Sequence, residues 1–306
     1  MLEKSIRILG AYGGKGVDIN NTSVQIDKHT TIDAGNILKG IGKDAKYINK
    51  IFLTHSHLDH IVDIPFLIDA FFEKKEIPIK IYALKETIIH LKKHLFNFDI
   101  WPDFSQINLI NKKLKAIEFI EIKANETIKF DNFSIKAIKT NHTISSCGYV
   151  IKKKNHAVLF TADTYKCDTI WEELNLNKFI KTLIIDVSFP SRLANIAKKS
   201  NHLTLKDLLE ELEKLKRDDI CIYINHLKPS YVKEIKKELE ELNSKYNIQL
   251  LNDGDILNLE TTKKQKRLIY ENSTKYHLKK IFENMTSKED FDKIIQKVQK
   301  EKEKIK

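Results

Sequence analysis

The sequence predicts an α/β protein in which two β-sheets pack face to face and helices cover their outer sides. From residue 5 to about residue 260, short apolar segments typical of strands alternate with longer amphipathic segments typical of helices. Two strand-rich stretches occur, and each is followed by strand–helix units. Because each sheet must bury an apolar face against another layer, this order favours two packed sheets with helices outside. The apolar fraction of 42% over 306 residues is enough for the core of one large domain.

The first part of the chain predicts strands rich in β-branched residues and separated by turns, followed by helices with apolar residues every three or four positions. The strands are Ser5–Leu9, Ser23–Asp27, Thr30–Asp33, Ile51–Leu53 and Ile79–Tyr82, and the helices are about Asp59–Phe72 and Leu84–Phe96.

The second strand-rich set comprises Ile117–Ile122, Thr127–Phe130, Phe133–Lys139, Gly148–Ile151 and Ala157–Phe160. The strand–helix units that follow are strands at Leu183–Asp186, Ile220–Ile224, Ile248–Leu251 and Asp255–Leu259, with helices from Thr204 to about Lys216 and at Lys228–Leu242. Thr204 is of the residue type that caps helix N-termini.

The last 46 residues differ from the rest and predict a separate basic tail. They carry 14 basic and 7 acidic residues, so +7 of the net charge of +11 lies there. We expect a catalytic-type domain at 1–260 and a tail at 261–306, with a linker at Thr261–Arg267 and one or two polar helices at Tyr276–Ile305. The tail is either a solvated appendage or a docking element for an anionic partner or a second subunit; we predict a homodimer.

The cysteine content and the distribution of apolar residues indicate the cellular compartment. The three cysteines, Cys147, Cys167 and Cys221, are odd in number and far apart, which favours neither a disulfide framework nor a cysteine zinc site. The N-terminus lacks the apolar run of a signal peptide, and no stretch approaches the roughly 20 apolar residues of a membrane span. The sequence therefore predicts a cytoplasmic protein with no membrane partner.

A dense group of polar residues interrupts two apolar runs in FLTHSHLDHIVDIP. His55, His57, Asp59 and His60 lie within six positions, between a predicted strand and a predicted helix. Side chains two apart in an extended chain share a face, so His55 and His57 point the same way. A carboxylate such as Asp59 is also favoured at a helix N-terminus. Imidazole and carboxylate are the ligands of zinc and related metals, so this segment predicts part of a metal site.

One such segment cannot complete two metal sites, and further ligand-type residues follow later strands. His142, Asp163 and His226 each come just after a predicted strand. Loops at strand ends gather at one edge of a sheet and carry function, so we expect these residues to converge on the first group.

Together, these residues resemble the metallo-β-lactamase fold hydrolases, which are αββα sandwiches with a one- or two-metal site. The resemblance covers roughly residues 5–260. THSHLDHI, LKETIIHLKKHLFNFDIWPDF, IIDVSFP, SNHLT and INHLKP are together similar to class II 3′,5′-cyclic-nucleotide phosphodiesterases. The HxHxDH motif alone indicates only the superfamily, whereas the second and fourth segments are more selective.

The resemblance implies two divalent cations, zinc or alternatively manganese, and assigns their ligands. One ion would be held by His55, His57 and His142 and the other by Asp59, His60 and His226, with Asp163 bridging both. Asp33 matches an early aspartate that supports the metal histidines. Asp59, Asp163 and His202 would take part in catalysis.

A metal pair can make water acidic enough to attack a phosphodiester and can offset the charge on the phosphoryl oxygens. The leaving oxygen needs a proton, and His202, just before the helix capped by Thr204, is the candidate general acid; it is otherwise an exposed loop residue. Trp101 and Phe104 either stack on a purine, close a lid over the site, or belong to a packed loop in which Pro102 fixes the turn. Ser145 and Ser146 either donate to phosphate or have no such role.

Three functions remain open. The first is hydrolysis of a small cyclic nucleotide, cyclic AMP before cyclic GMP, without a nucleic-acid partner. The second is a transfer-RNA 3′-processing nuclease of the same fold, which the basic tail favours, although residues 5–260 lack a Gly- and Lys-rich inserted arm. The third is a non-catalytic binding module in which the metal is structural and the basic tail is the binding surface.

Overall fold

Two seven-stranded mixed sheets form the centre of the protein in a computed structural model that describes residues 2–242 and 244–259. The first sheet has the order β14-β1-β2-β3-β4-β5-β6 and the second β13-β12-β11-β10-β9-β8-β7. The first comprises β1 (Ser5–Gly10), β2 (Ser23–Gln25), β3 (Thr30–Ile32), β4 (Lys50–Phe52), β5 (Ile79–Ala83), β6 (Ile117–Glu121) and β14 (Ile256–Asn258). The second comprises β7 (Thr127–Lys129), β8 (Ser134–Lys139), β9 (Cys147–Lys153), β10 (His156–Phe160), β11 (Ile180–Asp186), β12 (Cys221–Asn225) and β13 (Ile248–Leu250).

The pairing directions determine where the loops gather. Strands β3 to β6 are parallel in the first sheet and β10 to β13 in the second, while the remaining pairs are antiparallel. It follows that β1, β3 and β4 share one direction, and that β8, β10, β11 and β12 share one direction in the other sheet. The loops after these strands therefore lie at a common edge of each sheet.

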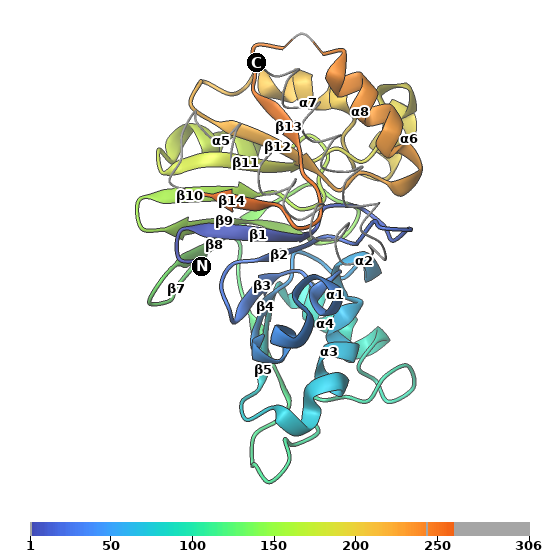
Figure 1. Cartoon of the computed structure of the whole chain (residues 1–306), viewed down its shortest axis with the longest axis vertical. Helices are drawn as coiled ribbons and strands as arrows, with labels where there is room; N and C mark the ends of the chain where they lie inside the picture. Colours follow the sequence, from blue (N-terminus) through green and yellow to red (C-terminus); the bar gives the residue numbers. More distant parts are fainter. Residues whose placement is uncertain (1, 243, 260–306) are drawn as a thin grey trace, which may run out of the picture. The chain divides into compact units, whose positions relative to one another are not determined.

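Helices cover the outer side of each sheet. Figure 1 shows one group beside β3 to β5 and another beside β11 to β13. The first group is α1 (Ile37–Ile41), α2 (Leu58–Ile61), α3 (Asp63–Phe71) and α4 (Lys85–His94), and the second is α5 (Asp168–Leu176), α6 (Ala194–Lys199), α7 (Leu205–Leu212) and α8 (Val232–Glu240). The predicted four-layer αββα sandwich is confirmed.

Strand β4 shows how the alternation of side chains builds two cores. Phe52 points to the second sheet, where its ring meets Tyr149 of β9 edge-on at 5.7 Å, and it stacks at 4.4 Å on Tyr82 of the neighbouring strand β5. Its neighbours Ile51 and Leu53 point the other way and join the core beneath α1 to α4. The Tyr149 hydroxyl donates to the Leu53 carbonyl at 2.7 Å, which ties the sheets together where β4 ends.

Local chemistry explains where the predicted elements were right or wrong. Thr204 does cap α7, in a capping box with Asp207. The helix predicted at about Asp59–Phe72 is divided in two at Val62, because the Asp63 N–H donates to the Ala34 carbonyl instead of continuing α2. Pro65 has no N–H for the Ile61 carbonyl and is accommodated only in the first turn of a new helix. Helices α1, α5 and α6 were not predicted.

The predicted linker at Thr261–Arg267, the helices at Tyr276–Ile305 and the whole proposed tail at 261–306 lie outside the described residues. Across 2–242 and 244–259, no helix is long and apolar enough to cross a bilayer.

Candidate metal centre

The predicted metal ligands meet where strands of both sheets end. His55 and His57 lie in the loop between β4 and α2, and Asp59 and His60 lie in α2 itself. Each of the others follows a strand that runs toward the same edge: His142 after β8, Asp163 after β10 and His226 after β12. The ligand atoms fall into two adjacent clusters.

The first cluster contains three imidazoles and one carboxylate oxygen. Nδ1 of His57 lies 3.0 Å from Nε2 of His55 and 3.1 Å from Nε2 of His142. Oδ2 of Asp163 lies 3.7 Å from Nε2 of both His55 and His142. A tetrahedral zinc ion with Zn–N bonds of about 2.0–2.1 Å places its ligands roughly 3.3–3.4 Å apart, so these spacings suit one cation.

The second cluster uses the other oxygen of the same aspartate. Oδ1 of Asp163 lies 3.3 Å from Nε2 of His60 and 3.1 Å from Nε2 of His226. The two imidazole nitrogens are 3.3 Å apart, and Asp59 Oδ2 lies 3.4 Å from His226 Nε2. Asp163 therefore contributes one oxygen to each cluster, as a bridging ligand would.

The buried oxygen Asp163 Oδ1 shows that the residues fit a cation. It has no hydrogen-bond partner, although the nitrogens of His60 and His226 lie within 3.3 Å. An unpaired buried carboxylate oxygen is costly. This oxygen and the two nitrogens lie close enough together for a divalent cation to be shared among them.

The remaining nitrogens of these imidazoles are held by partners that select the tautomer. The Thr54 hydroxyl donates to Asp33, so it must accept from His55 Nδ1 at 3.0 Å. His60 Nδ1 donates to Asp33 Oδ2 at 2.7 Å. His142 Nδ1 donates to the carbonyl of Asn201. In His55 and His142 this leaves Nε2 unprotonated and facing the first cluster. Burial lowers the pKa of His60, but the charges of Asp163 and Asp33 outweigh it and raise that pKa well above its ordinary value.

Burial keeps the first cluster in the metal-binding form. It lowers the pKa of His55 well below its ordinary value and that of His142 to about 4. Burial by itself would raise the pKa of Asp163, but the charges of His226 and His60 outweigh it and hold that pKa well below the usual range. Neutral imidazoles around an ionised carboxylate are what a divalent cation requires.

Four residues at this edge adopt left-handed backbone conformations that side chains disfavour. The φ angles are 54° at Asp33, 55° at Ala162, 52° at Asn201 and 63° at His226. Each costs on the order of 1–3 kcal/mol and persists only where surrounding structure enforces it. Two of these residues belong to the site, because His226 is a candidate ligand and Asp33 supports His60. The other two directly precede site residues in the chain, Ala162 before Asp163 and Asn201 before His202.

Gly13 makes room for the His226 imidazole. A Cβ at this position would lie 2.5 Å from Cε1 and Nδ1 of His226. We therefore expect Gly13→Ala to displace the ring and to weaken metal binding by roughly 10–100-fold. The matched control is Gly16→Ala in the same loop, whose Cβ would have its nearest contact at 3.7 Å. Calorimetric titration with Zn²⁺ measures the effect, and equal affinities in both variants would contradict it.

His202 lies beside both clusters. Its ring stacks on His226 with 5.3 Å between centroids and is tilted against His142 at 5.0 Å. Nδ1 donates to Asp186 Oδ2 at 2.7 Å, which directs Nε2 away from Asp186. Burial lowers the pKa of His202, but the charge and hydrogen bond of Asp186 outweigh it, so the pKa is raised. The side chain is buried, so it is not an exposed loop histidine.

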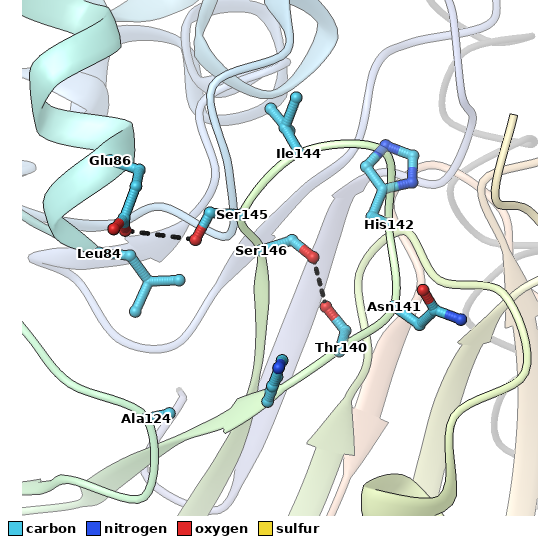
Figure 2. A pocket seen from close by; sticks show the side chains of 10 residues that line it. Leu84, Glu86, Ala124, Thr140, Asn141, His142, Ile144, Ser145 and Ser146 are labelled. Carbon is cyan, nitrogen blue, oxygen red and sulfur yellow. Dashed lines mark hydrogen bonds between the residues drawn. The ribbon is translucent and has the colours of Figure 1, made fainter.

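The predicted substrate residues lie in different surroundings. Ser145 and Ser146 line a pocket of about 390 Å³ together with His142 (Figure 2). In Figure 2 the Ser145 hydroxyl donates to Glu86 at 3.3 Å, and Ser146 is paired with Thr140 at 2.7 Å. The structure therefore brings Ser145 next to the first cluster, with its hydroxyl directed to Glu86.

The two aromatic candidates are less accessible. Trp101 is half-buried and packs edge-on against Phe66 at 5.2 Å. Phe104 is only 7% exposed and belongs to the core beneath α1 to α4, next to Phe72. The structure does not bring Phe104 to the clusters, and its ring faces are taken by core contacts.

Three residues at the site were not assigned from the sequence. Asp186 orients His202 and accepts from the hydroxyl of Ser188, which in turn accepts from His226 Nδ1 at 3.0 Å. Asp186 ends a predicted strand, so the strand-end rule that identified Asp163 also applies to it. Lys228 places Nζ 3.9 Å from Asp59 Oδ2. Ser188 lies in IIDVSFP and Lys228 in INHLKP, two segments that carry the family resemblance, and that resemblance is the signal that could have identified them.

Fold and site together define a two-sheet protein with adjacent clusters of His and Asp residues at its strand ends that could hold divalent metal ions. Residues 34–223 match the Beta-lactamase superfamily domain, which is more than half of the chain, and the chain belongs to that superfamily. The metallo-β-lactamase fold inferred from the HxHxDH motif is thereby confirmed.

Individual proteins with similar sequences or structures are more specific than the superfamily. The chain is 26% identical over 274 residues to a probable 3′,5′-cyclic-nucleotide phosphodiesterase of Yersinia pestis, covering 73% of this chain and 78% of that protein. It is 21% identical over 266 residues to a ribonuclease Z of Archaeoglobus fulgidus, covering 70% and 81%. The metallo-beta-lactamase fold protein YhfI of Bacillus subtilis superposes with a TM-score of 0.66 at 18% identity, covering 83% and 98%, which shows the shared fold. Both named relatives are hydrolases.

Proposed function

We propose that this chain is a metal-dependent phosphodiesterase that hydrolyses 3′,5′-cyclic nucleotides, cyclic AMP foremost, to 5′-monophosphates. The observation that carries the proposal is the pair of ligand clusters joined by Asp163, with His202 beside them. The similarity to the Yersinia phosphodiesterase supports the choice of substrate.

The residues that would hold two divalent cations are His55, His57 and His142 for one, Asp59, His60 and His226 for the other, and Asp163 for both. When bound, Zn²⁺ or Mn²⁺ would act as a Lewis acid on the phosphoryl oxygens and make a water molecule acidic enough to attack phosphorus. We favour zinc, because a site with five imidazoles suits it.

The side chains around the clusters position the substrate and move the proton. His202 holds a proton on Nδ1 against Asp186 and, when protonated on Nε2 as well, can donate that proton to the departing sugar oxygen. The raised pKa of His202 increases the protonated fraction near neutral pH. Lys228, beside Asp59, adds positive charge at the edge where an anionic diester would enter.

A nuclease acting on transfer-RNA 3′ ends is the second candidate, because the chain is also similar to ribonuclease Z. The same clusters would serve that reaction. Residues 5–260 contain no Gly- and Lys-rich insertion to grip RNA, which favours the small substrate. A non-catalytic module with a structural metal is the third.

A turnover screen separates these candidates. The full chain with Zn²⁺ or Mn²⁺ would be assayed on cyclic AMP, cyclic GMP, bis(p-nitrophenyl) phosphate and a precursor transfer RNA. We expect cyclic AMP to be opened and His55→Ala to abolish turnover while the circular dichroism spectrum is unchanged, because the variant lacks one ligand. Faster processing of the RNA, with binding that weakens only at high salt, would favour the nuclease. Full metal loading without any hydrolysis would favour the module.

The cytoplasmic location and the homodimer remain predictions from the sequence. Size-exclusion chromatography coupled to light scattering would measure the oligomeric state directly.

A further inference from the structure

A second cavity, which we call the α2–α4 pocket, lies next to the first cluster. Its volume is about 410 Å³, within the range of small-molecule sites. His57 links the two features, because its ring lines this pocket while its Nδ1 belongs to the first cluster. A molecule in the pocket therefore lies close to the proposed reaction centre. The described residues that line it are Ser56, His57, Leu58, Ile61, His90, Leu91, His94, Leu95, Ile100 and Ile144.

The walls of the α2–α4 pocket are mostly aliphatic. Leu91 and Ile61 are buried at its base, whereas Leu58 and Ile100 remain 65% and 64% exposed. Exposed aliphatic side chains next to a cavity are in contact with water. A flat apolar ring that covers them removes this apolar surface from water, which favours binding. None of the described lining residues is Lys, Arg, Asp or Glu, so the pocket suits a neutral group and not a second phosphate.

Two imidazoles supply polar atoms to this otherwise apolar space. His90 and His94 lie one turn apart on α4, with 6.2 Å between ring centroids. His90 Nδ1 is paired with the Ser56 hydroxyl at 3.0 Å, which fixes that ring. Sites that bind a heterocycle typically have apolar walls and a small number of polar groups, which orient the ligand by hydrogen bonds to its edge.

The pocket on the other side of Ile144 differs in character. Ile144 lines both cavities, and the neighbouring one is also lined by Glu86 and Ser145 (Figure 2). Lys139 lines it too. Charged and hydroxyl groups suit a polar occupant. Of the two pockets, the α2–α4 pocket is therefore the one suited to a planar base.

We infer that the α2–α4 pocket binds the nucleobase of the substrate, so that the enzyme selects nucleoside phosphodiesters over diesters without a base. The choice of occupant rests on the proposed phosphodiesterase function. The base lies between the aliphatic walls, and its edge meets His90 and His94 while the phosphate faces the clusters.

Binding of adenosine tests this subsite without requiring any reaction. Adenosine has no phosphate, so its affinity for the zinc-loaded full chain reports the pocket. We expect saturable binding whose Kd rises about tenfold in the double variant Ile100→Ser, His94→Ala, since both side chains are exposed and one aliphatic wall is lost. The control is Ile89→Ser, on α4 and 48% exposed but outside the pocket, which should change the Kd less than twofold.

A kinetic comparison provides the second readout. The wild type should open cyclic AMP at least tenfold more efficiently, in kcat/KM, than the same cyclic sugar phosphate without a base. The double variant should narrow this ratio through KM. If adenosine does not saturate the protein at millimolar concentration, or if the double variant keeps the wild-type Kd, the inference is overturned. If no diester is turned over, the proposed function fails, while adenosine binding still decides the pocket.

Discussion

An Asp163→Ala variant is expected to lose stable binding of divalent cations and to hydrolyse phosphodiesters roughly 10³-fold more slowly, equivalent to about 4 kcal/mol. The reason is geometric. One carboxylate faces both clusters, with Oδ1 near His60 and His226 and Oδ2 near His55 and His142. Its removal would take a ligand from each of the two proposed cations and would leave the imidazoles without the negative charge that they share.

Metal content by mass spectrometry and thermal unfolding with and without Zn²⁺ measure this loss. Binding to the folded state alone stabilises a protein by about 2.7 kcal/mol at a ligand concentration of 100 Kd, so the wild type should show a clear upward shift in Tm and the variant little. Asp163→Asn keeps the side-chain volume and separates loss of charge from loss of packing. Asp69→Ala, exposed on α3, is the control. Full metal stoichiometry with wild-type turnover in both Asp163 variants would refute the bridging role.

Replacing His202 by alanine is expected to slow the opening of cyclic AMP by roughly 10²–10⁴-fold while leaving hydrolysis of bis(p-nitrophenyl) phosphate within about tenfold of wild type. A sugar alkoxide is a poor leaving group and needs a proton, whereas nitrophenolate leaves without one. His202 is placed for that proton transfer because Asp186 holds its Nδ1 and its ring lies against His226 and His142.

The same variant tests an alternative role for His202. Its ligand-type nitrogen lies within 4.8 Å of ligand atoms of Asp163 and His226, so it is close enough to be a metal ligand itself. Equal losses on both substrates, together with reduced metal content, would assign it that role. Asp186→Asn should also slow the opening of cyclic AMP more than the hydrolysis of bis(p-nitrophenyl) phosphate. The loss of activity should be smaller than in His202→Ala, because the imidazole is still present and is only misoriented. His156→Ala, outside the clusters, should behave as wild type.

Much of this site follows from local patterns. His55, His57, Asp59 and His60 form a continuous motif between a strand and a helix, and the sequence places each later candidate after a strand. Strand ends are predictable because alternating apolar residues stop where the chain leaves the sheet. That is why the pattern could identify His142, Asp163 and His226 before any geometry was known.

Other features could not be read in this way. Phe104 sits in a segment that looks suited to stacking, yet it packs into the core beneath α1 to α4, because burial depends on neighbours far along the chain. The break between α2 and α3 occurs where the Asp63 N–H and the His60 carbonyl bond to Ala34, and Pro65 lacks a further N–H inside an otherwise helical apolar pattern. The α2–α4 pocket combines residues from 56 to 144.

The sequence by itself determined the chemical types of the ligands, their positions at strand ends and the two-sheet class of fold, because these depend on residue identity and short-range periodicity. Only the tertiary structure decided that one carboxylate divides its oxygens between two clusters, that Asp186 orients His202, and that Gly13 leaves space for His226. Those facts depend on distances between segments that lie far apart in the chain, in the case of Gly13 and His226 more than 200 residues apart. Such distances are set by the packing of the two sheets and not by any local run of residues.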